Sequence, residues 1–399
     1  MFATCVFLTM MTPCLTLAQK TKEKTVRQEL SQARSLIKSA KYADAEKLLK
    51  PLLKDSANRE NRRIYQAWFD AVRGQYDQAN ERMYLKQKQD TAEFFNITRR
   101  LFTVAEALDS VEMRPDQKGR VVMESRTKHS AQLHPLRANL FGAGNFHLRK
   151  FNWQEAFDYM ETYIDCARQP LFSVYAYDST DSRMPEAAYW ATYAGYKKQD
   201  AVLTLRYRHL ALRDSARAAF TLQYVAEARR WLNDDELYLA TLQEGFRRFP
   251  QFSYFFPRLV DYYNARGQYN CALAVADSAL AINDSSTLYL FAKSSALLQL
   301  QRYGECINYS EKLISINDSL PEVYYNAGTA YAYIAERFAG KRERKQMRAN
   351  YQKAQAHMER YRALKPDELQ KWGPALYRIY LNLNLGKQFD EIDRLLKEK

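Results

Sequence analysis

The sequence repeats itself at an interval of 34 residues. The tetrapeptide Ile-Asn-Asp-Ser occupies residues 282–285 and again residues 316–319, and the same shift brings Tyr269 onto Tyr303. Two apolar runs with helical spacing lie within each interval, which indicates a helix–turn–helix hairpin. One such hairpin cannot bury its apolar face alone. The period therefore predicts that successive hairpins stack against one another.

Composition agrees with this interpretation and excludes others. The 399 residues include only 12 Gly and 11 Pro, fewer turn formers than a sandwich or barrel of many short strands requires. Hydrophobic residues make up 47 % of the chain and charged residues 27 %, so it can bury a large core and is not intrinsically disordered. We find no convincing alternating strand pattern. The predicted fold is all-α, an α-solenoid of stacked antiparallel helix pairs.

Small residues recur where the two helices of a hairpin would meet. In the unit that begins at residue 287, the eighth residue is Ser294 and the twentieth is Cys306. In the next unit the eighth residue is Gly328. Small side chains at these positions let two antiparallel helices approach closely, while larger neighbours fill the space beside them. The sequence thus predicts which residues form the contact within each pair.

The unit that begins at residue 321 carries Tyr324, Gly328 and Tyr331 at the spacing W-x2-L-G-x2-Y. Here the chain resembles the tetratricopeptide repeat (TPR) family, specifically over residues 219–366 and as architecture over most of residues 25–398. The resemblance implies a TPR-like superhelix. It also implies a non-enzymatic protein–protein interaction scaffold, whose first helices line a concave groove that holds a peptide segment or a folded partner.

The chain is expected to divide into five segments. These are a signal peptide (1–18), degenerate N-terminal helix-pair repeats (19–168), a long loop (169–185), TPR-like repeats with a basic insertion at about 336–349 (186–366), and a C-terminal capping helix pair (367–399). The loop is expected because this stretch lacks periodicity and Pro170 and Pro185 bracket it. One degenerate pair is predicted from Ala67, Gly74, Tyr76, Ala79 and Met83.

The N-terminus predicts export. Residues 2–18 carry no charge, and Thr16 and Ala18 are small residues before a predicted cleavage at Gln19. No basic residue precedes the apolar run, and an ordinary buried first helix is the alternative. With its degenerate front half and its C-terminal segment, the chain resembles exported TPR proteins of Gram-negative cell envelopes, a group with no assigned activity. This resemblance implies the periplasm or cell envelope as its location.

Motifs for catalysis or cofactor binding are missing from the sequence. It has no GxSxG, Walker A, GxGxxG or CxxC motif, and His129 and His134 are too far apart for the HExxH spacing. We therefore predict neither an enzyme nor a cofactor or metal. Cys166, Cys271 and Cys306 are expected to be small buried residues at helix contacts. A disulfide between the last two is the alternative.

The TPR resemblance implies that positions 2, 5, 9, 12 and 13 of each first helix line the groove. The predicted partner groove comprises Tyr254, Asp261, Asn264, Phe291, Ser295, Tyr325, Thr329 and Tyr333. No lysine occupies these positions, which argues against the clamp that some family members use for acidic C-termini. The aromatic rings would instead suit an apolar peptide. Alternatively, some of them pack against the neighbouring repeat.

A basic stretch offers a second hypothesis. The chain has a net charge of +14, and residues 337–362 contain nine Lys or Arg and two Glu. The predicted basic surface comprises Arg337, Lys341, Arg342, Arg344, Lys345 and Arg348. It would suit a polyanion or a membrane surface, with anionic phospholipid or lipopolysaccharide as the contact. A secretory signal fits poorly with nucleic acid. A solvated, protruding helix without a partner is the alternative.

Overall fold

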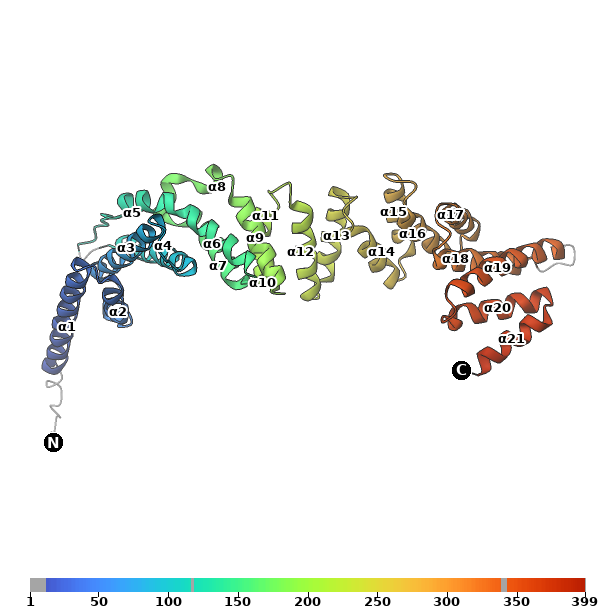
Figure 1. Cartoon of the computed structure of the whole chain (residues 1–399), viewed down its shortest axis with the longest axis horizontal. Helices are drawn as coiled ribbons and strands as arrows, with labels where there is room; N and C mark the ends of the chain where they lie inside the picture. Colours follow the sequence, from blue (N-terminus) through green and yellow to red (C-terminus); the bar gives the residue numbers. More distant parts are fainter. Residues whose placement is uncertain (1–11, 116–117, 339–342, 399) are drawn as a thin grey trace, which may run out of the picture. The chain divides into compact units, whose positions relative to one another are not determined.

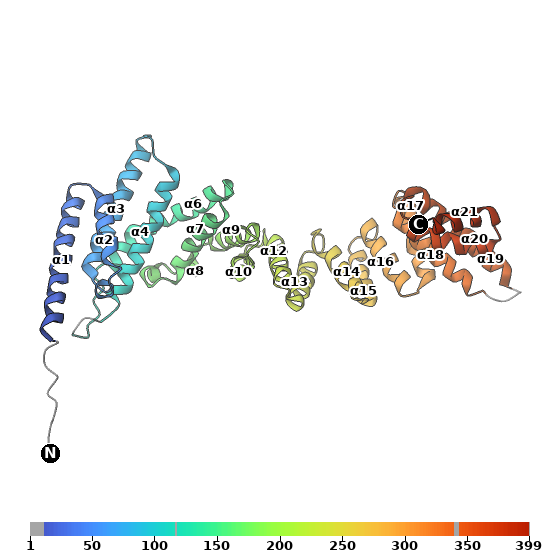
Figure 2. The same cartoon turned by 90° about the horizontal axis from the view of Figure 1, so that it is seen from below.

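The described part of the chain is helical and confirms the all-α prediction. The computed structural model describes residues 12–115, 118–338 and 343–398, and no strand occurs in these ranges. Contacts divide the chain into two compact units, residues 1–228 and 229–399. The division falls within α12 (Ala218–Trp231) and not at the predicted loop. Within each unit, successive helices reverse at short turns and pack in pairs (Figures 1 and 2).

The helices of the first unit lie before α12, and α12 itself begins in this unit. They are α1 (Thr12–Lys38), α2 (Tyr42–Leu52), α3 (Arg62–Tyr84), α4 (Thr91–Glu112), α5 (Arg126–Leu133), α6 (Arg137–Arg149), α7 (Trp153–Asp165), α8 (Tyr177–Thr180), α9 (Met184–Lys197), α10 (Ala201–Arg206) and α11 (Arg208–Ala211). The helices of the second unit follow α12. They are α13 (Asp235–Arg248), α14 (Phe255–Ala265), α15 (Tyr269–Leu280), α16 (Thr287–Gln299), α17 (Tyr303–Ile316), α18 (Pro321–Glu336), α19 (Arg344–Leu364), α20 (Leu369–Leu383) and α21 (Gly386–Lys397).

Helix α3 corrects one predicted pair. The stretch that contains Ala67, Gly74, Tyr76, Ala79 and Met83 is one continuous helix, with no turn at Gly74. A Cβ at Gly74 would lie 2.3 Å from the ring of Tyr42 in α2. The glycine therefore serves close helix packing. A glycine followed by small residues gives the same sequence signal for a turn and for a tight helix contact.

Short helical turns replace the predicted long loop. After a 3-10 turn (Cys166–Arg168), residues 169–185 contain a second 3-10 helix (Pro170–Tyr175) and the one-turn α8. Leu171, Phe172 and Tyr177 are buried. Ala176 separates the two turns with φ 46°, in the left-handed region that non-glycine residues rarely adopt. The segment is thus compact, although its buried side chains follow no helical period.

The second unit contains the regular repeats. Helices α15 and α17 begin 34 residues apart, as do α16 and α18. The turn between α14 and α15 contains Gly267 at φ 67°, and the equivalent turn one repeat later contains Gln301 at φ 58°. The predicted period is therefore present in the backbone.

The contact between α18 and α19 contains the small residue that the repeat predicts. A Cβ on Gly328 would lie 3.2 Å from the Met358 side chain and 3.3 Å from the Ala354 carbonyl oxygen. Ala354 and Met358 of α19 are fully buried. The predicted insertion lengthens α19 and the connection before it. Lys341 and Arg342 lie outside the described residues.

Buried polar contacts join α16, α17 and α18. The hydroxyl oxygens of Ser294 and Ser310 are 2.7 Å apart. The Asn326 amide donates to the hydroxyls of Ser294 at 3.1 Å and Ser295 at 3.0 Å. Cys306 is buried beside them. These contacts connect consecutive hairpins as well as the two helices of one hairpin.

No disulfide forms between the cysteines that the structure describes. Cys166 and Cys306 are buried, Cys271 is exposed, and all three are free thiols, so the alternative disulfide is absent.

The backbone of α1 is continuous from Thr12 across the predicted cleavage at Gln19, and residues 1–11 lie outside the described residues. Among the described helices, none combines the length and apolar character needed to cross a membrane.

Candidate functional site

The predicted aromatic groove keeps three of its four rings at least partly accessible. Phe291 of α16 and Tyr325 of α18 are half-buried, and 38 % of Tyr333 is exposed. The ring of Tyr325 lies 5.3 Å from that of Tyr361, and Tyr333 stacks on Tyr303 at 5.1 Å. Tyr325 is therefore supported by the following helix, α19, and Tyr333 by the preceding helix, α17, and both also reach solvent.

Tyr254 is the exception and requires a correction. Only 5 % of this residue is exposed, because its ring packs against Phe255 and lies beneath the Arg258 guanidinium at 3.8 Å. Its position just before α14 points it into the protein. The ring of Tyr254 is unavailable to a partner, but it holds Arg258 in place.

The predicted polar positions differ in their surroundings. Asp261 is exposed, whereas Ser295 accepts a hydrogen bond from Asn326 at 3.0 Å. The Asn264 Oδ1 and Thr329 Oγ1 atoms are buried and have no hydrogen-bond partner among the described residues. Of these four residues, only Asp261 is exposed, and the other three are half-buried.

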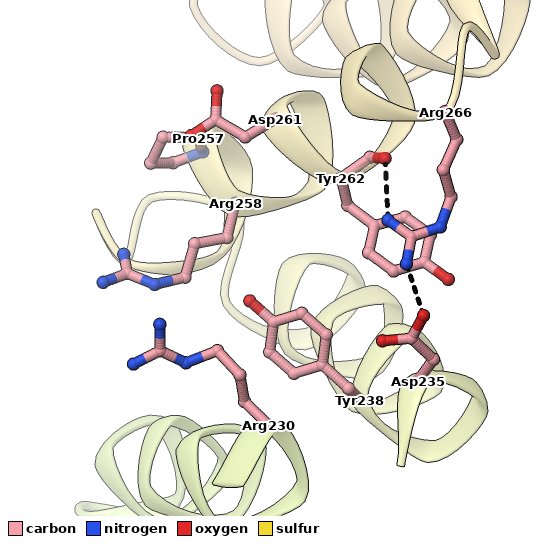
Figure 3. A pocket seen from close by; sticks show the side chains of 8 residues that line it. All are labelled: Arg230, Asp235, Tyr238, Pro257, Arg258, Asp261, Tyr262 and Arg266. Atoms are coloured by element: carbon pink, nitrogen blue, oxygen red, sulfur yellow. Dashed lines mark hydrogen bonds and ion pairs between the residues drawn. The ribbon is translucent and has the colours of Figure 1, made fainter. Parts of the chain in front are cut away.

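Asp261 lines a cavity of about 550 Å³ formed by α12, α13 and α14 (Figure 3). The other lining residues come from the last turn of α12, the first turn of α13 and the length of α14, with one residue just beyond it. They are Arg230, Asp235, Tyr238, Pro257, Arg258, Tyr262 and Arg266. Three arginines and two aspartates therefore surround one concave space.

The arginines of this cavity are held differently. Arg266 forms an ion pair with Asp235, donates to the Tyr262 carbonyl oxygen at 3.3 Å, and has its guanidinium 3.6 Å from the Tyr262 ring. Arg258 donates to the Tyr254 carbonyl oxygen at 3.3 Å. In Figure 3 the guanidinium groups of Arg230 and Arg258 lie at one end of the cavity and point to the same side.

The sequence analysis missed Arg230 and Arg258. Arg258 is the sixth residue of the unit that begins at residue 253, next to the fifth position, which is expected to line the groove. Arg230 lies in residues 219–252, where the repeat pattern is weaker. Extending the repeat numbering into residues 219–252 would have placed Arg230 at the twelfth position, which is expected to line the groove.

The predicted basic surface is solvent-facing where it is described. Arg337, Arg344, Lys345 and Arg348 are exposed. The Arg337 guanidinium lies 5.0 Å from the Tyr303 ring, beside the stack with Tyr333. Arg344, Lys345 and Arg348 belong to the first turns of α19. Lys341 and Arg342, in the connection, are outside the described residues.

Perturbed titratable groups occur in the first unit. Burial, together with the nearby Asp165 and Asp109 carboxylates, raises the pKa of Glu106 to about 8. Burial and the charge of Lys128 lower the pKa of His129 to about 4. Among the described residues, no group of three or more His, Cys, Asp or Glu side chains could hold a metal ion.

No family model matches the sequence, and no curated protein matches it. The chain is similar to TPR repeat proteins of known structure. The C-terminal part of a TPR repeat-containing protein from Cytophaga hutchinsonii aligns at 12 % identity and a TM-score of 0.44, covering 63 % of this chain and 92 % of that one.

Two further TPR structures show lower superposition. YrrB, described as a TPR protein with an unusual peptide-binding site, aligns at 15 % identity and a TM-score of 0.37, over 49 % of this chain and 93 % of YrrB. The TPR2AB domain of yeast Sti1, in a complex with pHSP90, aligns at 11 % identity and a TM-score of 0.25, over 63 % and 99 % of the two chains. The TPR-like array is nevertheless evident in this chain's own 34-residue helix spacing.

Proposed function

We propose that this protein is a non-enzymatic interaction scaffold of the cell envelope, which binds a segment of a partner protein on the first helices of its TPR-like hairpins. The observation that carries the proposal is the placement of Phe291 and Tyr325. They occupy the same position in consecutive repeats, and both are half-buried. Rigid, partly exposed aromatic side chains supply much of the binding energy in protein interfaces. Equivalent positions on stacked hairpins present such side chains in a row.

A photo-crosslinking amino acid at position 291 tests this proposal. In the protein produced in its own cells, we expect it to capture one recurrent partner, and the added substitution Tyr325→Ala should reduce the capture at least tenfold. The matched control places the same cross-linker at Phe151, whose side chain is 72 % exposed in the first unit. Equal capture at both positions, or capture that survives Tyr325→Ala, would contradict the groove.

The envelope location has its own test. The apolar, uncharged residues 2–18 support export with cleavage before Gln19. N-terminal sequencing of the protein recovered from the envelope fraction should therefore begin at Gln19. A cytosolic protein that retains residues 2–18 would contradict export, without affecting the interaction groove.

A second candidate function rests on α19. Arg344, Lys345 and Arg348 are exposed, and none of them forms an ion pair within the described residues. These three cations could contact anionic phospholipid or lipopolysaccharide, at about 1 kcal/mol for each nearby Lys or Arg. Vesicles of anionic phospholipid should then bind the protein at low salt and release it as the salt concentration rises. Replacing all three residues by Glu should abolish binding, and unchanged binding would exclude this surface.

A further inference from the structure

Three hairpin turns of the first unit share one backbone motif. In the turns after α3, α6 and α9, the second residue beyond the helix has a positive φ: Lys86 at 54°, Phe151 at 58° and Gln199 at 57°. The next backbone N–H donates to the carbonyl oxygen five residues earlier, at 2.9–3.0 Å. This is the Schellman ending of a helix, in which the left-handed position usually holds glycine. The three turns are therefore structurally equivalent.

These turns lie along one edge of the first unit. The ring of Phe95, at the start of α4, is 5.5 Å from that of Phe146, at the end of α6. The ring of Trp153, which begins α7, is 5.8 Å from that of Tyr193, near the end of α9. Figure 2 shows the α3–α4 and α6–α7 turns at the same edge of this unit. We call the residues at the three turns the turn edge. It comprises residues 82–89, 149–154 and 197–199.

Large apolar side chains are exposed at the turn edge. Tyr84 is 85 % exposed, Leu85 54 % and Phe151 72 %. The Phe151 ring meets the Trp153 ring edge-on at 5.5 Å, which leaves most of it in water. A bulky residue at positive φ is strained, and this one gains little burial that could offset the strain. Neither the backbone nor the packing accounts for a phenylalanine here, and an outlier of this kind points to a functional role.

The same edge carries positive charge that the fold does not neutralise. It contains no carboxylate, and Glu81 offsets only Arg82, its neighbour in the sequence. Six other cations are exposed, and within the described residues none of them forms an ion pair. They are Lys86, Lys88, Arg149, Lys150, Lys197 and Lys198. Their contacts are with neutral groups. The amines of Lys150 and Lys197 lie over aromatic rings at 4.2 Å and 5.6 Å, and that of Lys198 donates to the Gln154 amide oxygen.

The carboxylates that follow the turns in the sequence have partners of their own. Asp90 and Asp200 cap α4 and α10, and they accept backbone N–H bonds at 2.8 Å and 3.0 Å. Glu93 and Glu155 form ion pairs with arginines of α4 at 3.7 Å and 3.1 Å. The helix dipole compensates a negative charge at a helix N-terminus, and each arginine compensates its glutamate. The turn edge therefore keeps a net positive charge.

We propose that the turn edge docks on the surface of an anionic phospholipid bilayer. Its lysines and arginines meet the headgroup phosphates, and Tyr84, Leu85 and Phe151 enter the boundary between headgroups and acyl chains. Apolar side chains with basic neighbours suit this boundary, because long basic side chains reach back to the headgroups while the apolar groups lie deeper.

A bilayer fits these features better than a protein partner does. The apolar side chains stand on separate turns with lysine or arginine next to them in the sequence, whereas the core of a protein interface is depleted of charged residues. Helix α19 also presents cations, but none of its described residues is a large exposed apolar side chain. The inference assigns lipid binding to the turn edge, and it is independent of the partner groove in the second unit.

Flotation of the full chain with lipid vesicles tests the proposal. Vesicles of phosphatidylethanolamine and phosphatidylglycerol should bind the protein at least tenfold more tightly than vesicles of phosphatidylcholine, which carry no net charge. The variant Y84S/L85S/F151S removes the apolar side chains and should lose at least tenfold in affinity for the anionic vesicles. The variant K86E/K88E/R149E reverses three charges and should lose at least as much.

Two matched variants separate the turn edge from other exposed groups. V174S/I316S/L381S removes three apolar side chains that are exposed elsewhere and should change the affinity less than twofold. R344E/K345E/R348E reverses the same charge on α19 and should also change it less than twofold. Circular dichroism melts show whether each variant is folded. A loss in either matched variant as large as that in the edge variants, or no binding by the unaltered protein, would overturn the proposal.

Phe151 offers a readout that a purely structural role would not give. Glycine adopts the left-handed conformation freely, so F151G should keep or raise the melting temperature, whereas its affinity for anionic vesicles should fall severalfold. A lower melting temperature with unchanged vesicle affinity would contradict the proposal.

A polarity-sensitive fluorescent amino acid shows whether the edge itself meets lipid. At position 151 its emission should shift to shorter wavelength when anionic vesicles are added, and at the equally exposed position 174 it should not. Equal shifts would count against the turn edge. F291A/Y325A should leave vesicle binding within twofold, so a failure of the partner groove and a failure of the turn edge are seen separately.

Discussion

The repeats α14–α18 and the irregular segment 166–183 bury their residues in different ways. In the repeats, small and large apolar residues alternate at fixed positions, and other positions stay open to solvent. The irregular segment instead covers a charge. Arg137 is buried with its guanidinium 3.7 Å from the ring of Tyr163 and 4.0 Å from that of Tyr177, and it forms an ion pair with Asp181. Regular packing therefore leaves side chains available for a partner, whereas the irregular segment uses its polar groups for its own fold.

The largest expected effect is at Arg137. Arg137→Ala would leave Asp181 without its buried partner and the Tyr163 carbonyl oxygen without two donated hydrogen bonds. We expect a loss of about 3–5 kcal/mol in the free energy of unfolding of the first unit. Urea titration followed by circular dichroism measures this loss. Arg183→Ala, at an exposed position nearby, is the control and should change stability by less than about 0.5 kcal/mol. Similar values for the two variants would mean that the segment does not depend on the buried charge.

An intermediate effect is expected within the repeats. Gly328→Leu would force a branched side chain against Met358 and the α19 backbone, at a cost of about 1–3 kcal/mol. Gly304→Leu is the matched control, because a Cβ at Gly304 meets nothing within 4 Å. Thermal melts should show a lower melting temperature for the first variant only. Equal melting temperatures would refute the alignment of Gly328 with the helix contact.

A further expected effect is the pH dependence of the first unit. The pKa of Glu106 is about 8 in the folded protein, above its ordinary value of 4.5. The folded state thus keeps a proton that the unfolded state releases, and the free energy of unfolding falls as the pH rises from 5 to 8. Glu106→Gln removes this dependence, so the variant should keep its free energy of unfolding between pH 5 and pH 8, whereas the unaltered protein loses about 1.4 kcal/mol for each pH unit in this window. If the free energy of unfolding changed with pH in the same way for the unaltered protein and for Glu106→Gln across this range, Glu106 would titrate normally.

The sequence predicts the repeats well because their packing is periodic. Gly328 occupies the expected buried contact, where it meets Ala354 and Met358 from beyond the insertion. The same logic fails for Gly74, because a tight helix contact and a turn both favour glycine. It also fails for residues 169–185, whose buried Leu171 and Phe172 follow each other directly in a 3-10 helix.

The candidate site is predictable only in part. Repeat numbering finds the faces that carry Phe291 and Tyr325, because equivalent residues share one side of their helices. It does not predict that Tyr254 turns inward, since this residue precedes the first turn of α14 and its direction depends on the local backbone. It also does not pair Arg230 with Arg258, because their proximity depends on how two neighbouring hairpins meet.

The hydrogen bonds from Asn326 to Ser294 and Ser295 also restrict how this array could change its length in evolution. Excising residues 287–320 would remove one complete repeat and preserve the period. Asn326 would then face Val260 and Asp261, the residues one repeat earlier, in place of the two serines. Val260 offers no acceptor in place of Ser294, so the Asn326 amide would lose that hydrogen bond inside a closed contact. Neighbouring repeats of this chain are consequently not interchangeable, because the polar atoms between them match only in the present order.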